Sequence, residues 1–152
     1  MEKYEDEYSQ SEKDIKSLFV TYEMALKLYE KGFNEYCIVN YDNKKLNNYP
    51  HPLDMGISNI ELKRFNKNNS ITAPLYQQVV EWFDKKKILI IPEVQFILKP
   101  KEIIWTVTII NLVNDYNLYL SKLEKRIFNS RTECIIAAIE YLLTDEYVLT
   151  MF

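Results

Sequence analysis

Apolar residues follow two different periods in the middle of this chain. Between residues 73 and 87 they recur every three or four positions, which is the spacing of an amphipathic helix. Residues 88–98 and 103–112 are instead rich in β-branched and aromatic side chains, which favour strands. This order predicts a helix that lies on an antiparallel sheet. The stripe expected to face the sheet is Leu75, Val79, Trp82 and Phe83, with the aliphatic stem of Lys86 as an extension.

Two prolines place these elements more closely. Pro74 is expected in the first turn of the helix, where its missing N–H leaves no hydrogen bond unmade. Pro92 cannot donate to a neighbouring strand, which predicts that its strand lies at a sheet edge or contains a bulge. Residues 103–112 are apolar on both faces, so we expect a central strand there.

Another helix is predicted at residues 21–31. Thr21 is expected to cap its start, and Gly32 to end it, because glycine enters the left-handed region without strain. Phe33 would then pack back on Leu28, as in a Schellman motif. The apolar stripe expected to be buried is Tyr22, Ala25, Leu26 and Tyr29.

The segments between the helices are less regular. Residues 36–41 indicate a strand, whereas residues 42–72 hold many Asn, Pro and Gly residues, which indicate loops. Within that region we expect a short edge strand at residues 57–65. Residues 118–128 fit either a helix or two short strands, and we favour strands because they would extend the sheet.

The clearest helix start lies near the end of the chain. Ser130 and Glu133 have the spacing of a capping box, in which each side chain bonds the backbone N–H near the other. The apolar residues 147–152 would either pack on the domain or join a partner chain. The stripe expected to be buried is Ile135, Ala138, Ile139, Leu142 and Leu143.

Together these elements predict an α+β fold, with an antiparallel sheet of three to five strands and about three helices packed on it. Residues 1–12 are rich in acidic side chains and are expected to form a flexible head. The remaining residues, 13–152, have the length and the apolar content of one domain with a single core.

Charge and hydropathy exclude several classes of protein. The net charge of −3 and the pI near 5.3 argue against general nucleic-acid binding. The order of elements over residues 73–143 is similar to the double-stranded RNA-binding domain, but Arg131 is followed by Thr132 and Glu133 and not by a basic cluster. No apolar run reaches the roughly 18–20 residues of a membrane span, and no secretion signal is evident, so we expect a cytoplasmic protein.

Reaction chemistry is not indicated by the residue types present. The single histidine, His51, lies between two prolines in a predicted loop, and neither Cys37 nor Cys134 lies in the setting of a catalytic triad. We expect both cysteines to be reduced thiols in the core. One histidine and two isolated cysteines do not form a zinc site, so we expect neither a metal nor a cofactor.

Two places could hold a ligand. Arg131 is expected in the first turn of the last helix, where a guanidinium and backbone N–H groups could bind an anion; a solvated arginine is the simpler interpretation. An aromatic pocket could use Tyr76 or Trp105 together with Gln77, although Trp105 would also suit the core.

Four segments carry a resemblance: YEMALKLYEKGF at residues 22–33, APLYQQVVEWFDKK at residues 73–86, the strand IIWTVTI, and FNSRTECIIAAIEYLL at residues 128–143. In this order they resemble short proteins of phages and prophages of gut Bacteroidetes, which share a helix ending in Gly-Phe and an Ala-Pro-x-x-Gln-Gln-x-x-x-Trp helix. This chain departs from their pattern at residues 132–134. The resemblance implies phage origin and the host cytoplasm, and it implies no particular activity.

These observations favour a non-enzymatic phage accessory protein that binds a host protein or a small anionic ligand, with the countering of host defence as one form of that role. Its apolar tail would suit a homo-oligomer. A virion or assembly component is the first alternative. A small hydrolase that uses carboxylates is the second.

Overall fold

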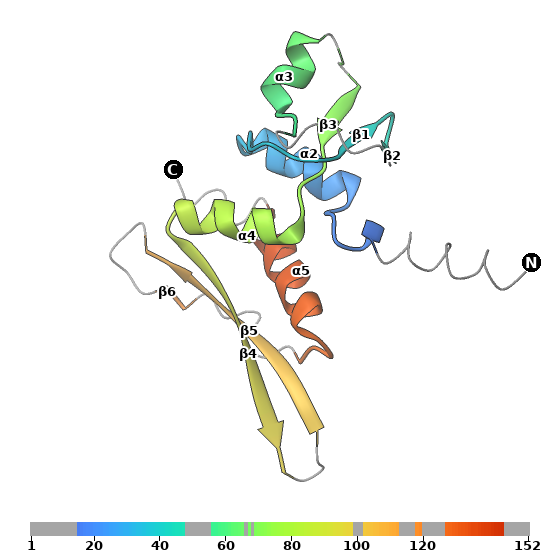
Figure 1. The fold of residues 1–152 in the computed structure, drawn as a ribbon. Coiled ribbons are helices and arrows are strands. Elements are labelled where there is room, and N and C mark those ends of the chain that lie inside the picture. Colours follow the sequence, from blue (N-terminus) through green and yellow to red (C-terminus); the bar gives the residue numbers. More distant parts are fainter. Residues whose placement is uncertain are drawn as a thin grey trace, which may run out of the picture. The chain divides into compact units, whose positions relative to one another are not determined.

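A computed structural model describes residues 15–47, 56–65, 67, 69–98, 102–112, 118–119 and 127–144 (Figure 1). The chain divides into two compact units, the first ending at Tyr76 and the second beginning at Gln77. Each unit is therefore described by itself. The acidic head predicted for residues 1–12 lies outside the described residues, and one domain over residues 13–152 stays a prediction.

Helices and antiparallel strands occur in both units, which confirms the predicted α+β class. The described strands form two sheets of three strands each, in the orders β2-β1-β3 and β4-β5-β6, where the sequence predicted one sheet. The first unit contains α2 (Tyr22–Glu30), β1 (Asn40–Asp42), β2 (Lys45–Leu46), α3 (Asn59–Arg64) and β3 (Ser70–Thr72). The second contains α4 (Tyr76–Lys85, which begins at the boundary), β4 (Ile88–Ile97), β5 (Glu102–Asn111), β6 (Leu118–Tyr119) and α5 (Arg131–Leu142).

Helix α2 begins and ends as predicted. The side chain of Thr21 accepts a hydrogen bond from the N–H of Met24 at 3.3 Å, which caps the first turn. At the other end Gly32 has a φ of 85°, and the N–H of Phe33 donates to the carbonyl of Leu28 at 2.9 Å. This 6→1 bond is that of a Schellman motif.

The buried face of α2 differs from the predicted stripe. Met24, Ala25 and Leu28 are buried, and α2 packs on β3. Leu26 is 39% exposed, and Tyr22 is only half-buried. The prediction was right for Ala25 and wrong for Leu26, because the core touches the neighbouring face of the helix. The face of Tyr22, Leu26 and Tyr29 borders a hollow instead.

The short edge strand predicted at residues 57–65 is the helix α3. The Ser58 side chain accepts from the N–H of Glu61 at 3.4 Å, and the Glu61 carboxylate accepts from the N–H of Ser58 at 3.1 Å. This capping box starts the helix, and Ile57 keeps only an isolated bridge to Cys37. The strand predicted at residues 36–41 is correspondingly shorter, because β1 begins at Asn40.

The second unit is built on a long hairpin. Strands β4 and β5 pair in continuous antiparallel register from Ile88↔Asn111 to Ile97↔Glu102. Strand β5 is central and β4 lies at the edge with Pro92 inside it, so both predictions are confirmed. Strand β6 confirms strand at residues 118–119, and residues 120–126 lie outside the described ones.

Pro74 was predicted in the first turn of the helix, but α4 begins two residues later, at Tyr76. The carbonyl of Pro74 accepts from the N–H of Val20 at 3.0 Å, which holds Pro74 in an extended segment before the helix. Val79, Trp82 and Phe83 are buried as predicted. Leu75 precedes the helix and is only half-buried, so its place in the helical stripe was predicted wrongly. Lys86 is exposed, which corrects its predicted burial, although its Nζ lies 4.7 Å from the centroid of the Trp82 ring.

Helix α5 packs on β4 and β5, and all five residues of its predicted stripe are buried. Ser130 accepts from the N–H of Glu133 at 3.2 Å, as expected for the cap. The Glu133 carboxylate accepts from the N–H of Asn129 at 2.8 Å, one residue before the position that a capping box predicts. The apolar residues 147–152 lie outside the described part.

Replacing Ser130 with alanine should lower the free energy of unfolding by about 1 kcal/mol, because the N–H of Glu133 loses its acceptor. Chemical denaturation followed by circular dichroism measures the change. Thr132→Ala is the matched control, since Thr132 is exposed in the same turn. Equal stability of the Ser130 variant and the unmodified protein would show that the cap does not contribute.

Candidate functional site

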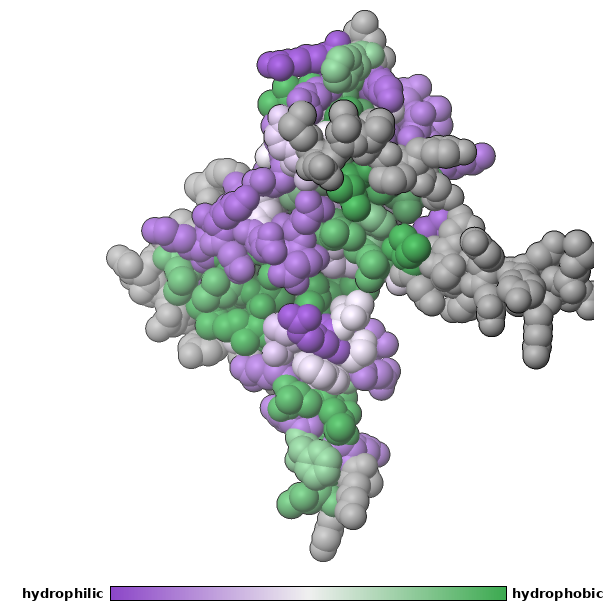
Figure 2. Space-filling model, in the orientation of Figure 1, coloured by the Kyte–Doolittle hydropathy of each residue, from purple (hydrophilic) through white to green (hydrophobic). Residues whose placement is uncertain are grey.

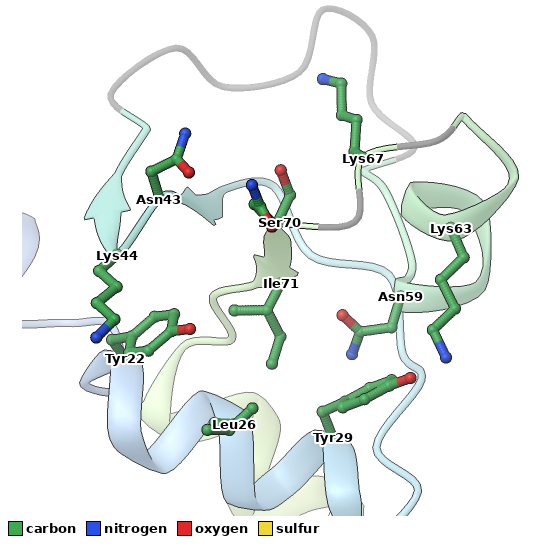
Figure 3. Close-up of a pocket in the computed structure, with 11 residues that line it drawn as sticks. Tyr22, Leu26, Tyr29, Asn43, Lys44, Asn59, Lys63, Lys67, Ser70 and Ile71 are labelled. Carbon is green, nitrogen blue, oxygen red and sulfur yellow. The ribbon is translucent and has the colours of Figure 1, made fainter.

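The first unit contains a hollow of about 430 Å³ between α2, α3, β3 and the turn that joins β1 to β2 (Figure 3). Its floor is the face of α2 that the sequence had assigned to the core. Tyr22, Leu26 and Tyr29 lie along that face of α2. Ile71 of β3 also lines the hollow and lies above this face. Because Tyr22 and Tyr29 are seven residues apart on one helix, they are separated by about 10.5 Å along its axis.

A lysine lies against the tyrosine at each end of this floor. The Nζ of Lys44 lies 5.9 Å from the centroid of the Tyr22 ring, and the Nζ of Lys63 lies 4.9 Å from that of Tyr29. Both distances are within the range of cation–π attraction, which favours a charged ammonium over the ring face. The pairs therefore place a positive charge at either end of the hollow.

The Tyr22 ring also packs against a second tyrosine. It meets Tyr41 edge to face, with ring centroids 5.5 Å apart. The hydroxyl of Tyr41 donates to the carbonyl of Val20 at 2.6 Å. Burial raises the pKa of Tyr41, so this hydroxyl keeps its proton and remains a donor.

At the other end, α3 presents Lys63 and is itself fixed by a buried amide. The Nδ2 of Asn59 donates to the carbonyl of Phe33 at 3.0 Å, and its Oδ1 accepts from the N–H of Thr72 at 2.9 Å. The amide therefore ties α3 both to the end of α2 and to β3. Asn59 borders the hollow, but its amide serves the structure.

Lys44 occupies a strained turn. Strands β1 and β2 pair as Asp42↔Lys45, which leaves Asn43 and Lys44 as a two-residue hairpin loop. Both have positive φ, 48° and 67°, as a type I′ turn requires. Glycine is preferred at the second of these positions, and a residue with a Cβ costs about 1 kcal/mol there.

The charge of the hollow is positive. Among the described residues that line it, Lys44, Lys63 and Lys67 are cationic and none is a carboxylate. Asn43 and Ser70 add polar groups on the side away from α2, and Asn69 also lines the hollow. The Ser70 hydroxyl donates to the carboxylate of Asp42 at 3.1 Å, outside the lining. Such a hollow is suited to bind an anion.

The residues that the sequence proposed for ligand binding lie elsewhere. Tyr76 belongs to the first unit, where its hydroxyl lies 3.8 Å from the sulfur of Met24. In the second unit, exposed Gln77 donates to Glu81 at 3.3 Å, and exposed Arg131 is the first residue of α5. Their role in binding stays a prediction.

Trp105 and the start of α5 are brought together by the backbone. The N–H of Trp105 donates to the carbonyl of Phe128 at 3.0 Å, and the N–H of Phe128 donates back at 2.9 Å. This bridge places half-buried Trp105 near the segment that leads to Arg131. Two predicted residues thus lie in one region, although no side-chain contact joins them among the described interactions.

Five residues of the hollow were missed by sequence reasoning: Tyr22, Tyr29, Lys44, Lys63 and Lys67. The tyrosines had been noticed as a helical stripe, but a stripe alone does not distinguish the core from the floor of a hollow. The lysines lie in the Asn- and Lys-rich region of residues 42–72. Their only signal was the capping box at Ser58, which would have placed Lys63 on a helix.

The cysteines are unsuited to chemistry. Both are free and fully buried, as predicted. Burial raises the pKa of the Cys37 thiol to about 12 and also raises that of Cys134, so neither forms a thiolate near neutral pH. No cluster of three His, Cys, Asp or Glu side chains that could hold a metal ion occurs in the described ranges.

Apolar side chains are also exposed on the outer half of the β4–β5 hairpin, and Figure 2 shows them along this ribbon. Ile90 and Val107 are buried near α5. Further out on the same face, four apolar residues are more than half exposed: Val94, Phe96, Leu98 and Ile103. The apolar face of the hairpin therefore extends beyond the part that α5 covers.

Comparisons with known protein families, with curated proteins and with solved structures gave no match to this chain. The resemblance to phage proteins stays a prediction. Among the helices of the described residues, none has both the length and the apolar character that crossing a bilayer demands.

Native protein should not react with a thiol reagent such as DTNB at pH 8, because both thiols are buried and protonated. Both should react once denaturant unfolds the chain. Since the unfolded thiol ionises near pH 9 and the folded Cys37 only near 12, the free energy of unfolding should fall as the pH rises through this window. Rapid labelling of Cys37 in the native protein, identified by mass spectrometry, would contradict its burial.

Proposed function

We propose that this protein is a non-enzymatic binding module that holds a small anionic molecule in the hollow of its first unit. The observation that carries the proposal is the set of three lysines that line the hollow, two of them placed over tyrosine rings. Ammonium groups held in place beforehand bind an anion with less loss of side-chain entropy than free ones do.

The lining residues support binding and not turnover. The described ones include no histidine, thiol or carboxylate that could act as a general base. Ser70 supplies the only hydroxyl of a serine or threonine among them, and it donates to Asp42 without a histidine between the two. The three lysine heads that line the hollow are donors without acceptor capacity, which suits them to recognise an acceptor-rich ligand.

The resemblance to phage proteins adds a biological setting to this proposal. In that setting the ligand is a small anion of the host cytoplasm, and the protein acts by sequestering it. The countering of host defence is then one outcome of sequestration. Analogy supports this part of the proposal, whereas the lysines of the hollow support the binding itself.

Inorganic tripolyphosphate is a simple probe of the anion site. At low ionic strength it should raise the melting temperature of the protein, and Lys63→Met should weaken its binding about tenfold, because one charge-assisted contact is lost. Lys27→Met is the matched control, since Lys27 is exposed on α2 and does not line the hollow. Titration calorimetry gives the affinities. An equal loss in both variants would show that general electrostatics, and not the hollow, bind the probe.

The outer hairpin favours a second candidate role, contact between two copies of this chain. An isolated two-stranded ribbon is at best marginally stable, so contact of its apolar face with another apolar surface would stabilise it. That face carries no charge at Val94, Phe96 and Ile103, while Glu93 lies on the opposite face. Two identical uncharged faces complement each other about a twofold axis. The exposed patch comprises four side chains, far fewer than the roughly 20–30 residues per side of a standard interface, so the dimer is expected to be weak.

Sedimentation velocity over a range of protein concentration tests this contact. Phe96→Asp should abolish the concentration-dependent dimer, because a carboxylate would be buried in the apolar contact. Gln95→Asp adds the same charge on the opposite face of the same strand and should leave the dimer intact. A dimer that survives Phe96→Asp, or a monomer at every concentration, would exclude the hairpin face as the contact.

A further inference from the structure

We infer that the ligand of the hollow is a linear molecule with an anionic group at each end, and that the two tyrosine–lysine pairs select its length. This inference rests on the proposed function, because it concerns the same hollow. It adds the shape of the ligand and the positions of its charges.

The two tyrosine–lysine pairs lie apart along α2. Figure 3 shows Lys44 beside Tyr22 at one end of the hollow and Lys63 beside Tyr29 at the other. Seven residues of one helix separate the tyrosines, which corresponds to about 10.5 Å. The two ammonium groups lie beside different tyrosines, at opposite ends of the hollow, so an extended dianion is better suited to contact both than a compact anion is.

The two tyrosine rings hold lysine heads. Each tyrosine has an ammonium over one face, so that face is not open to a planar group of a ligand. Tyr41 also packs edge to face with Tyr22. The rings are therefore better placed to hold the lysine heads than to stack on an aromatic ligand, which favours end charges over a nucleobase.

The surface between the two tyrosine–lysine pairs includes apolar side chains. Leu26 and Ile71 lie there and carry no hydrogen-bonding side-chain group. An uncharged, largely apolar middle would contact this floor at no cost of desolvation. Lys67 lies on the side away from α2.

Lys44 lies in a strained turn. A glycine would satisfy the φ of 67° without strain, yet the chain has a lysine whose head lies over Tyr22 at the hollow. Backbone strain of this kind is often kept where a side chain serves a ligand site. The structure thus gives an independent reason to assign a binding role to Lys44.

The ligand class is accordingly an α,ω-dianion, whose end groups are carboxylates or phosphates. Both engage an ammonium by charge-assisted hydrogen bonds, so the spacing of the charges matters more than the identity of the end group. Parallel series of dicarboxylates and of alkanediol bisphosphates distinguish these two sources.

Titration calorimetry with dicarboxylates from butanedioate to dodecanedioate tests the inference. Affinity should pass through a maximum at an intermediate chain length, and the monomethyl ester of the best diacid should bind about tenfold more weakly. A continuous rise with chain length would show that apolar contact alone drives binding. Equal affinity of diacid and monoester would show that only one end is recognised. Either result would overturn the inference.

Two variants then locate the ends. Lys44→Gly should raise the melting temperature of the free protein by removing strain, and should reduce the affinity for the diacid to about that for the monoester. Lys63→Met should cause the same loss of affinity, and Lys27→Met should cause none. Undiminished affinity for the diacid in the Lys44→Gly variant would contradict the inference.

Tripolyphosphate separates failure of this inference from failure of the proposed function. If tripolyphosphate binds in a Lys63-dependent manner but the dicarboxylates and bisphosphates show no optimum of length, the hollow binds anions and the length selection is wrong. If none of the three kinds of probe binds, both the inference and the anion site are wrong.

Discussion

The candidate site depends on one buried amide, that of Asn59. Its Nδ2 donates to the carbonyl of Phe33 and its Oδ1 accepts from the N–H of Thr72, so a single side chain joins the end of α2, the start of α3 and strand β3. Removing it would take one donor from the carbonyl of Phe33 and the acceptor from the N–H of Thr72, which is costly in an interior of low dielectric. Because α3 is held in this way, Lys63 faces Tyr29 on α2. The backbone spacing of Tyr22 and Tyr29, the tyrosines beside the two lysines, is set by the seven residues of α2 that separate them.

A second constraint acts where the chain approaches α3. Gly56 has a φ of 63°, and a Cβ at this position would lie 2.7 Å from the carbonyl oxygen of Cys37. The close approach lets Cys37 and Ile57 exchange two backbone hydrogen bonds, of 3.0 and 2.8 Å. Glycine is required here both for its conformation and for its missing side chain. Gly56 and Asn59 therefore anchor α3 from either side of its cap at Ser58.

The sequence predicted those features of the fold that depend on a few neighbouring residues. The cap at Thr21, the Schellman motif at Gly32 and the central strand β5 were all readable, because each depends on a few neighbouring residues. The hollow could not be read in the same way. Its lysines lie on a turn, on α3 and in the segment before β3, and only tertiary hydrogen bonds bring these together. The stripe of Tyr22 and Tyr29 was visible, but the sequence does not state which face of a helix the core will cover.

The distribution of charge around the hollow has a consequence for stability. Lysines that face one hollow repel one another, and the repulsion raises the free energy of the folded, ligand-free state. The tyrosine rings offset part of this cost at Lys44 and Lys63, whereas no ring pair involves Lys67 among the described contacts. An anion that binds only the folded state removes the repulsion and adds its own attraction. An anion bound in the hollow and the folded state of the first unit would therefore stabilise each other.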